Sequence, residues 1–178
     1  MTDQPLVQVL RALAKLKMDY MLTGSYASNV YGKVRSTFDA DLVIALSAQG
    51  ISSLVKSMDN AFYLDSRSLD EIKESGGQFN AVHKSSGLKI DFYLLGSDPY
   101  SKEAFSRRRR HSLFGESVWV VAPEDLILAK LRWAKEGGSQ RQIEDAQGVY
   151  QLQRDGLDLQ YLRRRAAALS LSDLLEKL

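Results

Sequence analysis

The chain has 178 residues, 44% of them hydrophobic and 26% charged, with a formal net charge of +2, which is typical of one globular domain. It contains no cysteine, which excludes disulfides, thiolate zinc sites and cysteine nucleophiles. It has neither the roughly 20-residue apolar stretch of a membrane span nor the pattern of a signal peptide, so we expect a cytoplasmic protein without a membrane partner.

The first 121 residues mix helical and strand patterns. Apolar residues recur every three or four positions over 4–17, which predicts an amphipathic helix. Alternating or continuous apolar runs, bounded by turn residues, indicate strands. The expected strands are 20–23, 38–46, 62–64, 78–83, 88–95 and 117–121, and the expected helices are 26–31, 49–58 and 101–110.

After Pro123 the pattern becomes helical. Pro123 and two acids suit a helix start, Gly137 and Gly138 suit its end, and Ser139 is a suitable N-cap for the next helix. Two short helices are expected to close the chain. The sequence therefore predicts an α/β (α+β) fold, in which a mixed sheet flanked by helices (1–121) carries a helical C-terminal part (122–178) in one compact domain.

Two acids stand side by side in the predicted strand 38–46. Residues two apart share a face of a strand, so Asp39 and Asp41 point one way while Phe38, Ala40 and the following apolar residues point the other. Neighbouring carboxylates repel each other, and a cation relieves that repulsion. Oxygen ligands on a rigid strand suit Mg²⁺.

A third acid also lies on the face of its strand opposite the apolar residues. In strand 88–95 the apolar residues share one face and Asp91 lies on the other. If the two strands are neighbours, Asp39, Asp41 and Asp91 form a carboxylate triad. Such a triad can hold two divalent ions that clamp the attacking and leaving oxygens of a phosphoryl-type displacement.

Gly24 and Ser25 lie where a strand gives way to a helix. Glycine lets a phosphate approach the backbone, and free N–H groups at a helix start can bind it. A Gly-Ser pair alone is usually a turn, and an Asp-x-Asp pair alone is usually a solvated edge. The two pairs in this order, with the acids on one face of their strands, indicate a nucleotide site much more specifically than either pair alone.

The segments MLTGS (21–25) and RSTFDADLV (35–43) resemble the signature of the polymerase-beta-type nucleotidyltransferase superfamily. The Arg-x-Thr-x-Asp-x-Asp form is similar to the small bacterial branch that includes AbiEii-type toxins. The runs APEDLILAKL (122–131) and SQRQIEDA (139–146) resemble that branch too, so that the resemblance covers about half of the chain.

The resemblance implies a role for each matching residue. Gly24 and Ser25 would bind the triphosphate of an NTP such as ATP or GTP. Lys130 would reach a phosphate, and Asp145 would support Lys130 or the nucleotide. The metal ligands and catalytic acids would be Asp39, Asp41 and Asp91, holding Mg²⁺, with two ions expected.

The reaction implied is transfer of a nucleoside monophosphate to a hydroxyl of an RNA, such as a tRNA end, or of a protein. The toxin–antitoxin resemblance adds an antitoxin as a partner. Two other interpretations stay open: a non-catalytic module that binds a nucleotide or a partner, and an RNA-binding protein that uses the arginine runs 107–110 and 163–165.

Several of these residues also have ordinary interpretations. Arg35 suits a phosphate contact and a surface position equally well. Lys130 and Asp145 fit exposed helix positions, and the arginine runs fit solvated helix ends. Trp119 and Trp133 lie among apolar residues, so packing in the core is the default expectation for both. His83 and His111 have no metal-ligand neighbour at short spacing, which indicates structural roles.

Overall fold

The computed structural model describes residues 4–45, 47–64, 72 and 77–178. In this part of the chain the strands form one seven-stranded sheet in the order β3-β4-β5-β2-β1-β7-β6. The strands are β1 (Asp19–Thr23), β2 (Asp39–Ala45), β3 (Phe62–Leu64), β4 (Gln78–His83), β5 (Lys89–Leu94), β6 (Arg109–Leu113) and β7 (Glu116–Val120).

Strand β2 is paired on both sides near the middle of the sheet. It runs antiparallel to β1 and parallel to β5. The pair β1–β7 is also parallel, whereas β3–β4, β4–β5 and β6–β7 are antiparallel. The sheet is therefore mixed, as the sequence predicts.

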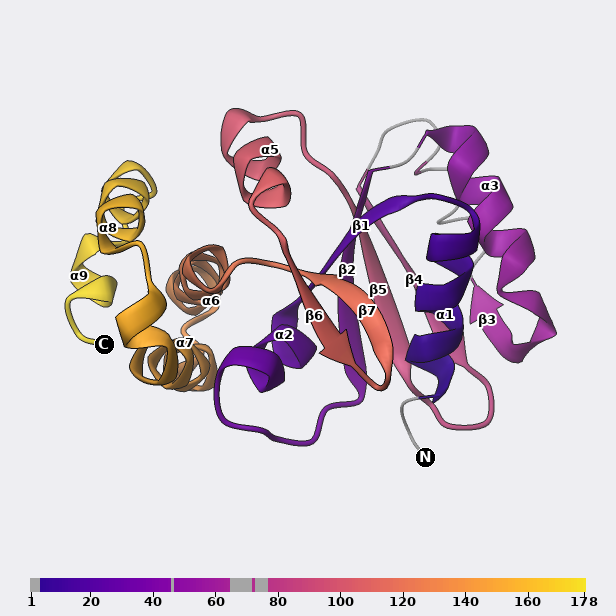
Figure 1. Ribbon diagram of the computed structural model, residues 1–178, viewed down its shortest axis with the longest axis horizontal. Coiled ribbons are helices and arrows are strands. Elements are labelled where there is room, and N and C mark those ends of the chain that lie inside the picture. Colours follow the sequence, from indigo (N-terminus) through magenta and orange to yellow (C-terminus); the bar gives the residue numbers. More distant parts are fainter. Residues whose placement is uncertain (1–3, 46, 65–71, 73–76) are drawn as a thin grey trace.

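Helices cover both faces of the sheet (Figure 1). The helices α1 (Gln4–Lys15) and α3 (Ala48–Ser57) lie on one side, and α5 (Pro99–Ser106) and α6 (Pro123–Gly137) lie towards the other. Helix α2 (Gly24–Tyr31) follows β1 directly. On β2 the even-numbered side chains are fully buried and the odd-numbered ones are not, so apolar packing fixes which face meets the core. The buried set on β2 is Ala40, Leu42 and Ile44.

The C-terminal helices extend outward from α6, and the C-terminus lies far from the N-terminus (Figure 1). Helix α6 begins at Pro123 and ends where Gly138 adopts a left-handed conformation with φ of 65°. The others are α7 (Gln140–Gln153), α8 (Leu159–Ala168) and α9 (Ser172–Leu175). Ser139 precedes α7, but its side chain makes no capping hydrogen bond. None of the described helices is long and apolar enough to cross a bilayer.

A buried charge cluster joins the sheet, α6 and α8. Glu124 and Asp125, in the first turn of α6, are 0% and 1% exposed. The Arg107 guanidinium contacts both carboxylates at 3.1 Å. The Tyr161 hydroxyl donates to Asp125 Oδ1 at 2.6 Å, and the Asp158 N–H donates to Glu124 Oε1 at 2.9 Å. Buried carboxylates need such partners, so these contacts fix α8 and the α5–β6 connection to α6. The division between 121 and 122 stays a prediction.

The helix predicted over 101–110 is wrong at its C-terminal end. Helix α5 ends at Ser106, and Arg109 and Arg110 belong to the edge strand β6. Arg109 contacts Glu124 at 3.3 Å, and Arg110 donates to the Ser117 hydroxyl at 3.1 Å. The run is therefore not a solvated helix end, because charge pairing and strand pairing engage its side chains. Phe38 also departs from expectation, since it precedes β2 and is 68% exposed.

The cluster makes Arg107 a strong determinant of stability. Replacing Arg107 by Met leaves two buried carboxylates short of a counter-charge, so we expect the free energy of unfolding to fall by about 3 kcal/mol. Arg163→Met is the matched control, because Arg163 is exposed and has no ion pair among the described residues. Urea unfolding followed by circular dichroism measures both, and equal midpoints for the two variants would contradict the assignment.

Candidate active site

Two of the three predicted acids lie opposite each other on paired strands. The parallel ladder of β2 and β5 pairs Asp41 with Asp91, and the antiparallel ladder of β1 and β2 pairs Thr23 with Asp41. Burial, and then the charge of Asp91, raise the pKa of the Asp41 carboxyl, although the charge of Lys130 opposes this. A raised pKa means that the negative charge at Asp41 is under-compensated, which is the situation that a bound cation would relieve.

Asp39 lies two residues before Asp41 on the same strand and is exposed. It pairs in register with Lys89, whose ammonium contacts Asp91 Oδ2 at 2.9 Å. That hydrogen bond raises the pKa of Lys89. Within the described ranges, no three His, Cys, Asp or Glu side chains already converge as a metal-binding group. The donor set nevertheless consists of carboxylate oxygens on two rigid strands, which suits Mg²⁺.

The Gly24 backbone lies directly against the Asp41 carboxylate. Gly24 has φ of +63°, a conformation that other residues adopt only with strain. A Cβ placed there would lie 1.8 Å from Asp41 Oδ2. Thr23 is the N-cap of α2 but makes no side-chain capping bond, so the first N–H groups of α2 have no cap from it. Glycine is required here by both conformation and space.

Four predicted nucleotide-binding residues form one hydrogen-bonded network. Arg35 Nη2 donates to the Ser25 hydroxyl at 2.8 Å. The Arg35 guanidinium also binds Asp145 through two contacts of 3.1 and 3.0 Å, and Lys130 Nζ contacts the same carboxylate at 2.8 Å. Asn29 holds the Arg35 backbone through bonds of 2.8 and 3.0 Å. The network thus joins the loop after α2 to α6 and α7.

Lys130 and Asp145 are not surface residues. Their side chains are 5% and 11% exposed, which contradicts the ordinary interpretation of exposed helix positions. Burial works against ionisation of Asp145, but hydrogen bonds from Arg35 and Lys130, together with their charges, leave its pKa lowered. Asp145 therefore stays ionised and holds two cations beside Ser25 and the start of α2.

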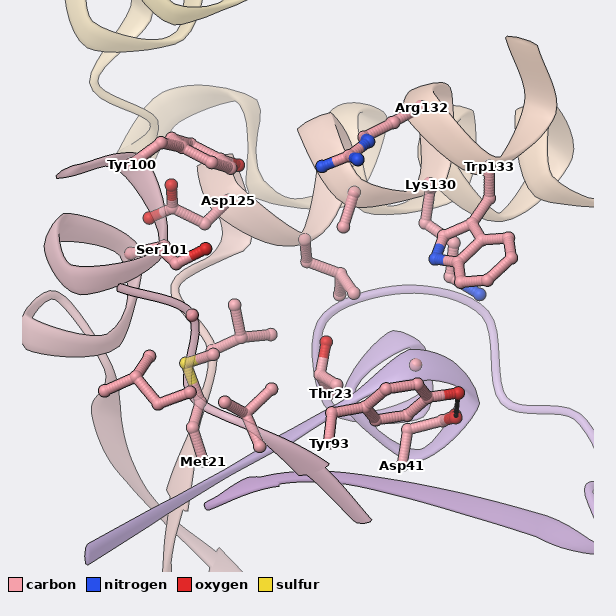
Figure 2. Close-up of a pocket in the computed structure, with 18 of the residues that line it drawn as sticks. Met21, Thr23, Asp41, Tyr93, Tyr100, Ser101, Asp125, Lys130, Arg132 and Trp133 are labelled. Carbon is pink, nitrogen blue, oxygen red and sulfur yellow. Dashed lines mark hydrogen bonds between the residues drawn. The ribbon is translucent and has the colours of Figure 1, made fainter. Parts of the chain in front are cut away.

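Arg35 and Asp145 line a separate cavity. Asp41 and Lys130 border a cavity of about 460 Å³ between the sheet, α5 and α6. Figure 2 shows Asp41, Tyr93, Lys130 and Trp133 at one end of it. Met21, Tyr100 and Ser101 lie at the other end. Gly24 and Ser25 also line this cavity. The volume suits a nucleotide or another small ligand.

The sequence interpretation overlooked two residues of the cavity. The Tyr93 hydroxyl lies 3.5 Å from Asp41 Oδ1, and burial, followed by the charge of Asp41, raises its pKa to about 12. Strand alternation could have found Tyr93, because it lies two residues after Asp91. Trp133, expected in the core, is 56% exposed and lines the cavity. Trp119, by contrast, packs partly buried against the core.

No family model matches the sequence, and no curated protein is significantly similar to it. Solved structures do share its architecture. ANT(2'')-Ia in complex with adenylyl-2''-tobramycin gives a TM-score of 0.67 at 14% identity, over 94% of this chain and 95% of that chain. The lincosamide antibiotic adenylyltransferase LnuA, with lincomycin bound, gives 0.57 at 12% identity, over 83% and 97%. An antigenic nucleotidyltransferase-like protein from Paracoccidioides brasiliensis gives 0.62 at 20% identity, over 98% and 92%.

The chain has the nucleotidyltransferase fold. The resemblance to the polymerase-beta-type superfamily is thereby confirmed at the level of the fold. At these identities the comparison concerns the backbone architecture and leaves the roles of individual side chains as predictions. The AbiEii-type branch within the superfamily also stays a prediction, because these three structures do not represent it.

The contact between Gly24 and Asp41 can be tested by adding one methyl group. Gly24→Ala should lose about 1 kcal/mol of stability through backbone strain. It should also displace the Asp41 carboxylate and abolish binding of NTP with Mg²⁺, measured by isothermal titration calorimetry.

Gly87→Ala is the matched control for that substitution. Gly87 has φ of +71°, and a Cβ there would meet nothing within 4 Å, so this variant carries the strain without the clash. It should lose similar stability and keep full binding. If both variants bind NTP equally well, Gly24 does not set the position of Asp41.

The buried charges of the network predict a second effect on stability. Asp145→Asn leaves Lys130 and Arg35 without their shared counter-charge, so the free energy of unfolding should fall by about 3 kcal/mol. Glu144→Gln, on the exposed neighbouring position of α7, should change it by less than about 0.5 kcal/mol. Thermal unfolding of both variants without nucleotide measures the difference, and a stable Asp145→Asn protein would show that the network is not a structural unit.

Proposed function

We propose that this protein is a nucleotidyltransferase that moves a nucleoside monophosphate from an NTP to an acceptor hydroxyl. The observation that carries the proposal is the alignment of Asp41 with Asp91 on paired strands, with the Gly24 backbone against Asp41. Asp41 and the start of α2, to which we assign phosphate binding, thus line one cavity. Phosphoryl-type transfer depends on such positioning and on charge stabilisation more than on covalent chemistry by the protein.

In the proposed reaction the acceptor oxygen attacks the α-phosphorus of the NTP. The bond from that phosphorus to the oxygen bridging to the β-phosphate breaks, and pyrophosphate leaves. The acceptor proton passes to a carboxylate at the floor of the cavity. Ser25 and the first N–H groups of α2 hold the β- and γ-phosphates, and Lys130 and Arg35 offset the negative charge that builds up on the leaving group.

Asp39, Asp41 and Asp91 are the proposed ligands for Mg²⁺, with two ions expected. The fit rests on their oxygen donors and on the under-compensated charge at Asp41. When bound, Mg²⁺ would lower the pKa of the acceptor hydroxyl and stabilise the departing pyrophosphate. Lys89, now paired with Asp91, is the cation that would have to turn away.

The acceptor predicted from the family resemblance is an RNA, such as a tRNA end, or a protein hydroxyl, with an antitoxin as partner. The arginine run 107–110 gives little support to RNA binding, because its side chains contact acids and backbone of the same chain. Arg163 and Arg164 remain exposed. The alternative of a non-catalytic RNA-binding protein therefore loses support from the run 107–110 but not from the run 163–165.

A small hydroxylated molecule is the second candidate acceptor. LnuA is described with lincomycin bound and ANT(2'')-Ia with adenylyl-2''-tobramycin, and both share this fold. A cavity of about 460 Å³, lined by residues of the sheet, α5 and α6, also suits a small molecule better than a folded macromolecule.

The non-catalytic alternative predicts nucleotide binding without transfer. The arrangement of Asp39, Asp41 and Asp91 argues against it, since mere binding of a nucleotide does not require an under-compensated acid such as Asp41 beside the proposed phosphate site. Transfer and binding can be separated directly by following the α-phosphate of the NTP.

Incubation of the protein with Mg²⁺, each α-³²P-labelled NTP, and tRNA, cell lysate or a small-molecule extract should label one acceptor class. Asp39→Ala/Asp41→Ala should reduce labelling by at least about a thousandfold, because both ligands of the metal on β2 are lost. Asp155→Ala, an exposed acid on the 3₁₀ turn after α7, is the matched control and should label normally. Label that persists in the double variant would refute the assigned acids, and no label from any NTP would support the non-catalytic module.

A further inference from the structure

Trp133 stands out among the aromatic residues around the cavity. It is 56% exposed, although a tryptophan presents a large apolar surface to solvent at that exposure. Among the described residues it takes part in no hydrogen bond, ring contact or cation–π contact. Trp119 differs, because the Arg108 and Arg110 guanidinium groups lie over its ring at 4.9 and 4.3 Å. Exposure of a single tryptophan does not by itself indicate a function. The functional argument therefore rests on the position of Trp133 in the wall of the cavity.

Trp133 lies one helical turn beyond Lys130 on the same face of α6. Residues three apart on a helix have Cβ atoms about 5–6 Å apart, and both side chains line the cavity. Figure 2 shows the indole beside the Lys130 side chain, across the cavity from the strand that carries Tyr93. The base of a nucleotide whose phosphates contact Lys130 can therefore reach Trp133.

The two ends of the cavity differ in chemistry. The end with Asp41, Lys130 and Trp133 contains the phosphate-binding groups, whereas Met21 and Tyr100 lie at the other end (Figure 2). In an in-line displacement the acceptor and the leaving pyrophosphate lie on opposite sides of the α-phosphorus. The donor nucleotide therefore occupies the Trp133 end, and the acceptor enters at the other end.

More than half of the Trp133 side chain is exposed, and it lines the cavity. Arg132, the preceding residue, donates to Glu136 at 2.9 Å and does not cover the ring. An aromatic face of this kind offers stacking to any nucleobase, since each base has a π-face.

From these contacts we propose that Trp133 is the platform on which the nucleobase of the donor NTP stacks. The inference rests on the proposed function and extends it to the part of the nucleotide that the phosphate network does not reach. It makes Trp133 a substrate-binding residue that sets nucleotide affinity without touching the reacting phosphorus.

The test compares ligands with and without a base. Calorimetry would measure the Kd of ATP, GTP, CTP and UTP as their α,β-methylene analogues, and of inorganic tripolyphosphate, each with Mg²⁺. Trp133→Ala should weaken the tightest-binding analogue about tenfold and leave tripolyphosphate unchanged. Trp133→Phe should recover most of the loss, whereas Lys130→Ala should weaken nucleotide and tripolyphosphate alike.

Fluorescence gives an independent readout in the Trp119→Phe protein, where Trp133 is the sole tryptophan. Nucleotide should quench that emission, and tripolyphosphate should not. Unchanged nucleotide affinity in Trp133→Ala, with no quenching, overturns the platform while the proposed function stands. If the wild-type protein binds neither nucleotide nor tripolyphosphate, both proposals fail. Because Trp133 is exposed, the melting temperature of Trp133→Ala should match the wild type, which separates a binding role from a folding defect.

Discussion

Strand β2 is paired to β1 on one side and to β5 on the other, and the two registers place Thr23, Asp41 and Asp91 in one row across the sheet. Shifting either pairing by one residue would turn the odd-numbered side chains of β2 towards the core and bury its acids. Ala40, Leu42 and Ile44 prevent that shift because their burial is complete. Apolar packing on one face of the sheet thus holds the acids together on the other face.

The sequence predicted the elements well where the pattern was strong, because burial of one face imposes the period of the element. It failed at β6, where Arg109–Leu113 offers no apolar alternation: this edge strand pairs only with β7 and its arginines bind acids brought from elsewhere. The carboxylates and the glycine of the candidate site were visible locally. The Lys130–Asp145 pair was implied only by the family resemblance, because the two residues lie on different helices and the packing of α6 against α7 brings them together. The prediction that Trp133 packs in the core was wrong, because the apolar residues next to it in the sequence lie on another face of α6.

Two groups of ion pairs help to attach the helical C-terminal part to the rest of the protein. The Glu124–Asp125 cluster fixes it through buried charges at the start of α6, while Asp145 reaches the loop after α2 through Arg35. Glu124 is fully buried, whereas Asp125 of the same cluster lines the cavity at the end away from Lys130. The second attachment lies beside the candidate phosphate site. Both ion-pair groups therefore support the fold within reach of the cavity.

The position of Asp145 has a thermodynamic consequence for any polyanion that binds here. Lys130 and Arg35 are already paired with a carboxylate, so an arriving triphosphate exchanges one anionic partner for another instead of meeting free cations. Much of the dehydration of these two cations is complete before the ligand arrives, because the folded chain has already removed most of their water. The carboxylate of Asp145, fixed on α7, thus holds the two cations in place until a polyanion replaces it as their partner.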